Sequence, residues 1–489
     1  MRGLARGSLT QSETTYRATF KNSHLPIYTT SLHACTRFRV KLAKHIQKLR
    51  PLDESELRVW FLDDILMGGL SMIFSKTFIN VITLSAGITT AAATITIAQN
   101  KEPSEWSRTD PYPNQTVYYP GTESLRPDEM RVIACGTGMP QPRLKQAAAC
   151  FLVELGNGEK FIFDMGEGSY ERIMALGIPL DQLDKVFLGH LHLDHAGDFP
   201  AFYFTGPVNN RLTPVRLWGP EGIKPEWGTK AWSDHMMKMW AWEEATRGAA
   251  VDPRGLQLEV NEFDWKAVNN VIFNENGVQV RTLPAIHGEQ SVSFLLEWNG
   301  LKFAFSSDTL PTRWWREHAA GADLAIHECF TPPEYMIEKY GFEPSEAIFV
   351  GSQGHTAAQA FGKIMSETEP RLAVCYHFQN DHDIALAVYS AIRETYDGPL
   401  DLAADFMTWN VTKDSIRTRQ GIPNEESFPA PVQMAKQPPD SAAEFPFSEF
   451  DLESMDLGAA EATNDMIEAF NERSGNNEVG AYTSLPFKE

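Results

Sequence analysis

The stretch His190-Leu191-His192-Leu193-Asp194-His195 places three histidines and one aspartate within six residues. Such a segment is ill suited to a core, because polar side chains without partners are costly in an apolar interior. Imidazole and carboxylate are instead ligands that zinc prefers. The apolar run at residues 183–189 predicts a short strand, so the motif would follow the strand's carboxyl end, where open α/β sheets place their sites. The stretch therefore predicts a metal centre in which the first two histidines face one ion and the other two ligands face a second.

Three further ligand-type residues each follow a strand-like segment. His287 follows residues 278–286, Asp308 ends the run 301–307, and His377 ends the run 371–376. Taken alone, a histidine after a strand is usually a hydrogen-bonded structural residue, and Asp308 would also serve as a helix N-cap. The repeated order of a strand and then a ligand predicts that these side chains complete a dinuclear site.

In these motifs the chain resembles the metallo-β-lactamase superfamily, and within it the ribonuclease Z and arylsulfatase branch. The family's HxHxDH motif reads here as residues 190–195, and His287, Asp308 and His377 follow in the family's order. The resemblance covers about residues 130–415. The sequence of this region is also similar to that of exported members of the branch, such as the hydrolases associated with guanitoxin biosynthesis. Further matches to the branch are Cys135-Gly136-Thr137-Gly138, Phe163-Asp164-Met165-Gly166, Trp218-Gly219-Pro220-Glu221-Gly222, Ser307-Asp308-Thr309, Ile326-His327-Glu328 and Gly354-His355-Thr356.

The resemblance implies a role for each candidate residue. Two Zn²⁺ ions are expected as cofactors, with Mn²⁺ or Fe²⁺ as alternatives at such His and Asp sites. The catalytic set would be Asp194, Glu328 and His355. In ribonuclease Z-like proteins, the glutamate and histidine equivalent to Glu328 and His355 form a proton relay for the leaving oxygen. Without the family pattern, Glu328 would equally be part of a strand-end ion pair and His355 a turn residue. The implied metal ligands are His190, His192 and His287 for the first ion, Asp194, His195 and His377 for the second, and Asp308 as the bridge.

The order of strands and helices predicts an α/β fold. Two mixed β-sheets packed face to face, with helices outside, would place all ligands at one edge, which is the αββα metallo-β-lactamase sandwich that the resemblance implies. Residues 401–419 are expected to form a closing strand or hairpin. The expected strands are 130–134, 151–155, 160–165, 184–189, 278–286, 293–298, 302–306, 323–327 and 372–376, and the expected helices include 167–177 and 356–366.

The two ends of the chain differ from this catalytic region, 99–423. Residues 1–66 are basic and lack periodicity, so we interpret them as an upstream extension without structure of its own. Residues 67–98 contain an uncharged Ile-, Val-, Thr- and Ala-rich stretch, 78–98, with small residues suited to cleavage. This pattern predicts a signal peptide and a periplasmic or secreted protein. A membrane anchor and an organelle presequence are the alternatives. Residues 424–489 have the composition of an acidic disordered tail.

The cysteines do not form the pattern of a disulfide framework. The sequence has five, and Cys135, Cys150, Cys329 and Cys375 all lie in or beside strand-like apolar runs. A buried thiol packs as a small hydrophobe. One bridge is compatible with this arrangement, but nothing in the spacing indicates it.

Charge and composition bear on the substrate. Without residues 1–98, which carry 12 basic and 6 acidic residues, the chain has 31 basic and 58 acidic residues and a net charge of −27. Such a protein repels a polyanion, because nucleic-acid affinity rests largely on neutralisation of phosphates by Lys and Arg. There is also no Gly-, Pro- and Lys-rich arm between the metal motif and Asp308, and Val292-Ser293-Phe294 replaces a family Gly-Tyr pair. Nucleic acid is therefore not the expected partner.

An aromatic and Met-rich segment, 203–245, lies within the catalytic region. Its part Trp232–Glu244 predicts a helix, which either roofs the metal site as a lid or packs as an ordinary helix. The expected function is that of a dinuclear zinc hydrolase, in which metal-bound hydroxide attacks a small-molecule phosphodiester, sulfate ester or similar ester. The alternatives are transfer-RNA 3′ processing, a lactonase or β-lactamase, and a catalytically silent binding module. A dimer is compatible with the sequence, and a membrane would be a partner only through 78–98.

Overall fold

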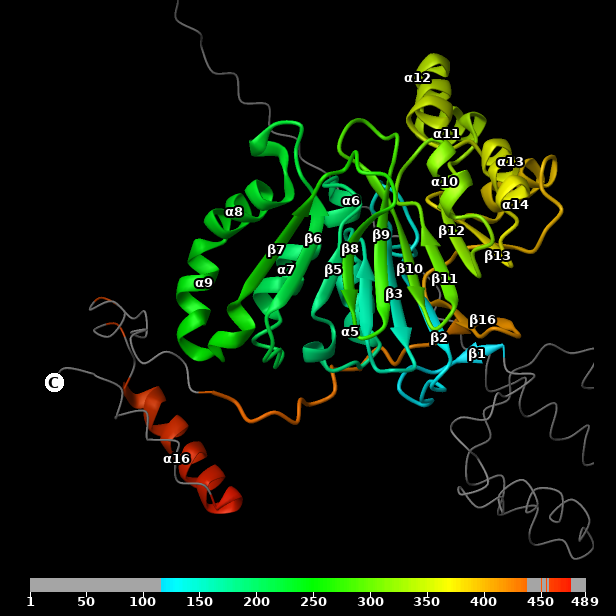
Figure 1. Cartoon of the computed structure of the whole chain (residues 1–489). Helices are drawn as coiled ribbons and strands as arrows, with labels where there is room; N and C mark the ends of the chain where they lie inside the picture. Colours follow the sequence, from blue (N-terminus) through cyan, green and yellow to red (C-terminus); the bar gives the residue numbers. More distant parts are fainter. Residues whose placement is uncertain (1–115, 438–449, 451–453, 455–456, 476–489) are drawn as a thin grey trace, which may run out of the picture. The chain divides into compact units, whose positions relative to one another are not determined.

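The computed structural model describes residues 116–437, 450, 454 and 457–475. Two β-sheets pack face to face, and helices cover their outer sides (Figure 1). This arrangement confirms the predicted αββα fold class. The predictions for residues 1–66 and 67–98 lie outside the described residues. Within the described part of the chain, no helix is both long and apolar enough to span a bilayer.

The first sheet contains the strand that leads into the metal motif. Its last four strands run parallel, so their carboxyl ends meet at one edge. The motif follows β5 at that edge. The sheet has nine strands in the order β1 (Val117–Tyr118), β16 (Ile416–Gly421), β15 (Met407–Val411), β2 (Met130–Gly136), β3 (Cys150–Leu155), β4 (Lys160–Phe163), β5 (Lys185–Phe187), β6 (Val215–Pro220) and β7 (Leu258–Phe263).

The second sheet carries the other candidate residues at the ends of its strands. Strands β11 to β14 are parallel, and β9 runs in the same direction because it is antiparallel to β10, which is antiparallel to β11. His287, Asp308, Glu328 and His377 therefore come to one edge. The sheet has seven strands in the order β14 (Leu400–Leu402), β13 (Leu372–Tyr376), β12 (Leu324–Glu328), β11 (Leu301–Phe305), β10 (Val292–Trp298), β9 (Val278–Pro284) and β8 (Asn270–Glu275).

Alternation along the strands builds three apolar layers. In β2, Val132 and Ala134 enter the core between the sheets, whereas Ile133 and Cys135 face the helices on the other side. The first sheet is covered by α5 (Ser169–Ala175), α7 (Phe199–Thr205) and α8 (Thr229–Met239). The second is covered by α10 (Arg313–His318), α13 (Ala358–Thr368) and α14 (His382–Arg393). The other described α-helices are α6 (Leu193–Ala196), α9 (Ala241–Arg247), α11 (Pro333–Tyr340), α12 (Pro344–Phe349) and α16 (Leu457–Ser474).

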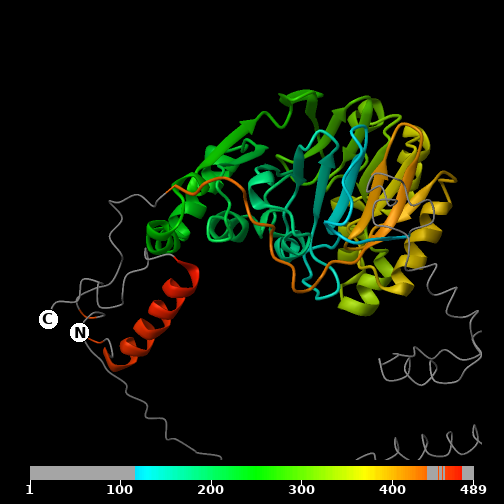
Figure 2. The ribbon, with the colours of Figure 1, turned by 90° about the horizontal axis from the view of Figure 1, so that it is seen from below.

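The residues after β16 include a strap, residues 424–437, which runs along the sandwich without helix or strand (Figure 2). The Ala430 N–H donates to the Gly177 carbonyl at 3.1 Å, and Arg254 Nη2 donates to the Ala435 carbonyl at 2.9 Å. Further along the chain, α16 is a helix that the prediction of an unstructured tail did not include. Composition indicates low apolar content over a whole segment, but it does not resolve a single helix within that segment.

A disulfide joins Cys329 and Cys375, with their Cα atoms 5.4 Å apart. Cys329 directly follows β12, and Cys375 belongs to the neighbouring strand β13. The bond ties together the two strands that lead to Glu328 and His377. Cys135 and Cys150 are buried free thiols, as their apolar surroundings predicted.

Candidate metal centre

The turn after β5 has room for the metal motif because residue 189 is a glycine. A Cβ atom at residue 189 would collide with the side chain of Ser307. The Gly189 N–H donates to Asp164 Oδ1 at 2.7 Å. The chain then enters α6, with His192 as its N-cap and Asp194 in its first turn. A single helical turn thus places several ligand-type side chains of the motif at the edge of the sheet.

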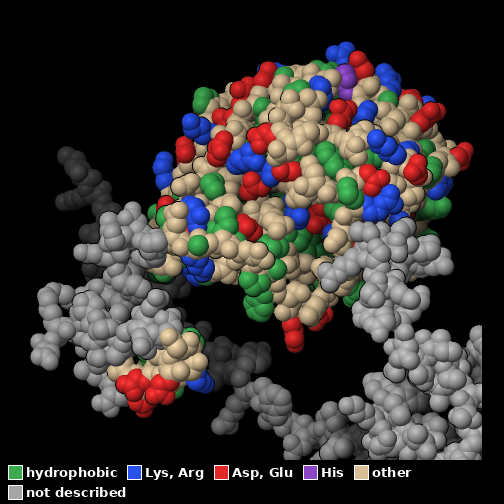
Figure 3. All heavy atoms as spheres, turned by 60° about the horizontal axis from the view of Figure 1, so that its bottom comes forward, with side chains coloured by type: hydrophobic (Ala, Val, Ile, Leu, Met, Phe, Trp, Pro, Cys, Tyr) green, Lys and Arg blue, Asp and Glu red, His purple; other side chains and the backbone are tan. Residues whose placement is uncertain are grey.

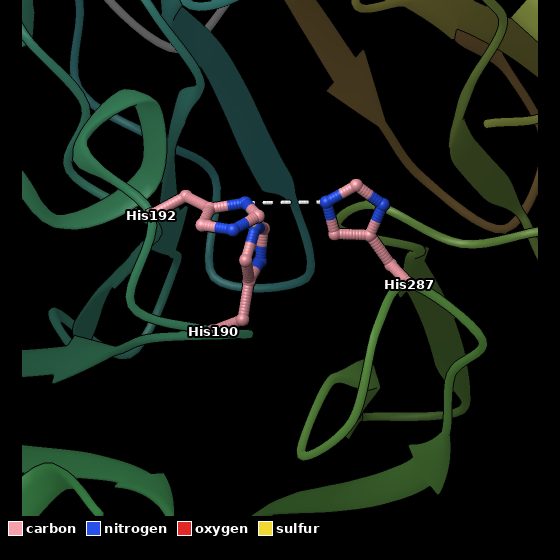
Figure 4. Close-up of side chains that lie close together, drawn as sticks. All are labelled: His190, His192 and His287. Carbon is pink, nitrogen blue, oxygen red and sulfur yellow. Dashed lines mark hydrogen bonds between the residues drawn. The ribbon is translucent and has the colours of Figure 1, made fainter. Parts of the chain in front are cut away.

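The first donor cluster consists of His190, His192 and His287. His190 Nε2 lies 3.0 Å from His192 Nδ1, and His287 Nε2 lies 3.2 Å from the same atom. In Figure 4 the three rings converge from two separate segments of the chain, the β5–α6 turn and the loop after β9. Three nitrogen atoms that face one another in this way could hold a cation between them.

These spacings fit zinc. Tetrahedral coordination with Zn–N bonds of about 2.0–2.1 Å separates two ligand nitrogens by about 3.3 Å. Burial lowers the pKa of His190 and of His192, which keeps both imidazoles neutral at physiological pH. Neutral imidazole is the form that binds metal. The donor set therefore fits a divalent ion in both chemistry and spacing.

The second donor cluster consists of four buried residues, Asp194, His195, Asp308 and His377. His377 Nε2 is 3.3 Å from Asp194 Oδ2 and 3.3 Å from Asp308 Oδ1. His195 Nε2 is 3.5 Å from Asp194 Oδ2 and 3.1 Å from Asp308 Oδ1. The other carboxylate oxygen of Asp308 lies 3.7 Å from His287 Nε2, a member of the first cluster. Asp308 thus lies between the two clusters.

Two atoms at the heart of the second cluster have no hydrogen-bond partner among the described residues, although they are 3.1 Å apart. They are His195 Nε2 and Asp308 Oδ1, and both are buried. Burial alone would lower the pKa of His195, but the carboxylates of Asp308, Asp194 and Asp164 raise it well above its usual value. A cation placed among these carboxylates would satisfy the same negative charge. The orphaned pair therefore fits a bound metal ion.

Side chains behind the clusters orient the ligands. Asp164 Oδ2 lies 2.7 Å from His195 Nδ1 and accepts a hydrogen bond from Ser307 Oγ at 2.8 Å. His287 Nδ1 donates to the Gly354 carbonyl at 2.9 Å. Such partners fix the tautomer of a metal-binding histidine and leave its other nitrogen free as a donor to metal. Backbone strain gathers here too, since Asp164, Ser307 and His377 have φ angles of 56°, 49° and 70°.

A buried acid–base pair adjoins the second cluster. His355 Nδ1 lies 2.9 Å from Glu328 Oε2, and the Thr309 N–H donates to Glu328 Oε1. Burial raises the pKa of Glu328 well above its usual value, and nearby Asp308 adds to this effect. Burial lowers the pKa of His355. Phe330 stacks on the His355 ring at 4.1 Å and helps to fix its orientation. The pair can hold and pass one proton at the edge of the donor clusters.

The structure places the nine candidate residues in three groups, in each of which the donor atoms lie within 4.8 Å of one another, and the second and third groups share Asp308 and His377. Asp164 and Ser307 are supporting residues that the sequence reasoning did not single out. Their signal was present, since both occur in quoted family motifs, but a motif does not tell which ligand a side chain supports.

The helix predicted at Trp232–Glu244 is split into α8 and α9 at Trp240. Met236 of α8 is buried in the apolar layer that covers the first sheet. No residue of α8 or α9 belongs to the described donor groups. Met236 thus shows α8 packed on the first sheet, and the lid over the metal site stays a prediction.

Residues 145–317 match the family model of the metallo-β-lactamase superfamily, and this range includes the metal motif, His287 and Asp308. The chain contains a metallo-β-lactamase superfamily domain. This match supports the enzyme class that the motifs predicted, a metal-dependent hydrolase.

Curated relatives of the metallo-β-lactamase domain include two ribonuclease Z proteins. The chain is 28% identical to that of Mycolicibacterium gilvum over 207 residues, which are 40% of this chain and 68% of the relative. It is 29% identical to that of Mycobacterium marinum over 209 residues, which are 40% of this chain and 70% of the relative. Both matches agree with the branch that the motifs indicated.

Solved structures with a similar fold include the short form of human tRNase Z, with a TM-score of 0.42 and 20% identity over 57% of this chain and 98% of that chain. The metallo-β-lactamase fold protein YhfI of Bacillus subtilis matches with a TM-score of 0.43 and 16% identity over 58% of this chain and 100% of that chain.

Proposed function

We propose that the chain is a dinuclear metallohydrolase that cleaves a phosphodiester, sulfate ester or similar ester of a small molecule. The observation that carries this proposal is the pair of adjoining donor clusters with the Glu328–His355 pair at their edge. In this assignment, His190, His192 and His287 would hold the first ion, Asp194, His195 and His377 would hold the second, and Asp308 would contribute to both.

The residues around the ions have separable tasks. Two divalent cations, when bound, supply Lewis acidity and activate water at neutral pH. Glu328 and His355 can share a proton next to the site, because both are buried and Glu328 Oε2 lies 2.9 Å from His355 Nδ1. Cleavage of a diester needs such a proton for the departing oxygen. Asp164 and Gly354 keep two of the histidines in the orientation that presents their Nε2 atoms.

Ribonuclease Z activity is the second candidate, and the curated relatives favour it. Two features of this chain support a small substrate instead. The net charge of the chain is −21. Residues 228–247, which follow β6, form the compact helices α8 and α9 in place of a basic arm. On the face drawn in Figure 3, Lys and Arg side chains are interspersed with Asp and Glu rather than gathered into a basic surface.

The Glu328–His355 pair also bears on lactonase or β-lactamase activity. A ring-opened leaving group stays tethered to the product, so lactone opening has less need of a separate proton donor than diester cleavage. The buried pair at 2.9 Å therefore supports the ester hydrolase over these alternatives.

The location of the protein is a further part of the proposal. We propose export to the periplasm or the exterior, as the composition of residues 67–98 predicts. The Cys329–Cys375 disulfide supports it, because disulfides persist in oxidising compartments and are rare in the cytosol.

Turnover of bis(p-nitrophenyl) phosphate by the zinc-loaded protein tests the activity. We expect release of nitrophenolate by the unaltered protein and loss of at least a hundredfold in Asp194→Ala, which lacks a candidate ligand. Metal content is measured in parallel, and a precursor transfer RNA is offered to the same preparation. Absence of diester turnover by protein that holds two metal ions would contradict the proposal. Efficient cleavage of the RNA would favour ribonuclease Z.

A further inference from the structure

His377 differs from two other candidate ligands in how its ring is supported. His195 and His287 each have a hydrogen-bond partner at Nδ1. His377 Nδ1 is buried and has no such partner among the described residues, and Glu328 Oε2, at 3.8 Å, is too far away for a hydrogen bond. The Nε2 atom of the same ring nevertheless faces the second donor cluster, 3.3 Å from Asp194 Oδ2. The direction of this ring therefore depends on the main chain that carries it.

The main chain at His377 has an uncommon conformation. Its φ angle is 70°, in the left-handed region that residues other than glycine seldom adopt. Such a conformation persists only where the surrounding contacts determine it. One of these contacts comes from Thr137, whose carbonyl accepts a hydrogen bond from the His377 N–H at 3.0 Å. Thr137 directly follows β2 and belongs to the motif at residues 135–138, which contains no candidate ligand.

Gln146 holds the chain on the other side of His377. It is buried, and both polar atoms of its side-chain amide form hydrogen bonds. Its Nε2 donates to the Phe378 carbonyl at 2.9 Å and to Thr137 Oγ1 at 3.1 Å. Its Oε1 accepts from the Asn380 N–H at 3.2 Å. One amide thus joins the segment after His377 to the residue whose carbonyl holds the His377 N–H.

Asp405 fixes this arrangement to other parts of the first sheet and its helices. Its Oδ1 accepts from Thr137 Oγ1 at 2.8 Å, and its Oδ2 accepts from the Ala147 N–H at 2.7 Å. Arg172 of α5 donates to Oδ2 through Nε at 2.6 Å. Asp405 therefore holds both ends of the loop that contains Gln146. The contacts that hold the main chain of His377 start from residues outside the donor clusters.

We propose that Gln146 is a positioning residue for His377, which acts together with Thr137 through the main chain on both sides of that histidine. The inference rests on the proposed function, in which His377 is a ligand of the second ion. The first donor cluster comes from other segments of the chain, and none of its histidines contacts Gln146 in the described structure. Loss of the Gln146 amide should therefore weaken binding of the second ion and spare the first.

Binding of Zn²⁺ to the metal-free, full-length protein tests this inference without any turnover. Competition with a chelator gives the affinities of the two ions, and His377→Ala identifies the ion that the second cluster holds. Gln146→Met keeps the length of the side chain but removes the amide. We expect it to lower the affinity for the second ion about 10–100-fold and to change that for the first by less than about threefold. Gln182→Met makes the same exchange at an exposed glutamine outside the donor clusters and is the matched control.

A second pair of variants decides the question if Gln146→Met does not fold. Thr137→Val removes the hydroxyl that links Gln146 to Asp405, whereas Thr137→Ser keeps it. We expect Thr137→Val to weaken the second ion about threefold and Thr137→Ser to leave its affinity unchanged.

Unchanged affinities in Gln146→Met would overturn the inference. Equal losses for the two ions would overturn it as well, because a general structural role predicts no difference between them. In the second pair, equal affinities of Thr137→Val and Thr137→Ser for the second ion would have the same meaning. Failure of the proposed function is seen separately, before any variant is compared, as an unaltered protein that binds fewer than two ions.

Discussion

The residues behind the candidate ligands determine how the centre is organised. Asp164 joins the metal motif to the end of β11, because its two oxygens accept from the Gly189 N–H and Ser307 Oγ and lie next to His195 Nδ1. It is fully buried and adopts a left-handed backbone conformation. A residue that keeps a costly conformation while it joins these two segments is one on which the positions of several ligands depend.

Asp164→Asn is expected to weaken zinc retention about 10–100-fold. The amide cannot accept at both oxygens, so it loses either the bond from the Gly189 N–H or the contacts with Ser307 and His195. Competition with a zinc chelator measures the effect. Asp397→Asn, at an exposed aspartate outside the centre, is the matched control and should leave retention unchanged.

Glu328→Ala is expected to lower kcat for bis(p-nitrophenyl) phosphate by about 10²–10⁴, because it removes the proton held with His355. Zinc content should stay at two ions, and a tethered lactone, if it is opened at all, should be much less affected. Glu334→Ala, at an exposed residue six positions on, is the control. Equal losses for the diester and the lactone would argue against the relay.

Asp198 allows a test of stability against pH. Burial raises its pKa to about 6, and its carboxylate accepts from the Tyr170 N–H. A raised folded-state pKa contributes stability below the unfolded value, near 4, and that stability is lost as pH rises through 6. The free energy of unfolding of Asp198→Asn should therefore rise relative to that of the unaltered protein between pH 5 and pH 7.5. The expected gain is on the order of 1 kcal/mol, because the carboxyl is partly solvated. Unfolding in urea at both pH values measures it.

At the scale of elements, the strands of the catalytic region were the most predictable part. Nine predicted strands correspond to β2–β5 and β9–β13, because apolar runs that end at a ligand or a turn are distinctive. β7 was not predicted, since five of its six residues are only partly buried or exposed and its pattern is weak. The short helices α11 and α12 were missed as well, because they are stabilised by tertiary packing more than by their own periodicity.

The candidate site was predictable for a related reason. The six-residue motif and the residues that follow strands are read directly from the chain, and parallel strands bring them to one edge. The disulfide could not be predicted from the sequence, because Cys329 and Cys375 lie 46 residues apart and only the pairing of β12 with β13 brings them together. The supporting role of Asp164 depends in the same way on contacts across the fold.

Removal of the disulfide is expected to destabilise the pair of strands β12 and β13. Closing a loop of 46 residues stabilises a protein by about 2–4 kcal/mol. The double variant Cys329→Ala/Cys375→Ala should lose about this much, as measured by denaturant unfolding without added metal. Cys135→Ala, at a free buried thiol, reports the loss of packing alone. Equal losses in the two variants would show that the bond itself contributes nothing.

At the scale of the whole molecule, the net charge distinguishes between the two candidate substrates, transfer RNA and a small-molecule ester. The net charge of −21 opposes association with a polyanion at low ionic strength, where such repulsion is least screened. We therefore expect no saturable binding of transfer RNA below about 100 µM, the weak end of non-specific nucleic-acid affinity. Fluorescence anisotropy of labelled RNA at 50 mM and 200 mM salt measures this. Tight binding that weakens with salt would instead indicate a basic surface that serves RNA.

The compartment in which the protein is produced determines whether Cys329 and Cys375 are joined. Protein produced in a reducing cytosol would carry two thiols at this position, whereas the same polypeptide folded in an oxidising compartment would carry a cross-link beside Glu328. Batches with identical sequences would then differ in covalent structure next to the centre. A count of free thiols on each batch is therefore needed before activities from different production hosts are compared.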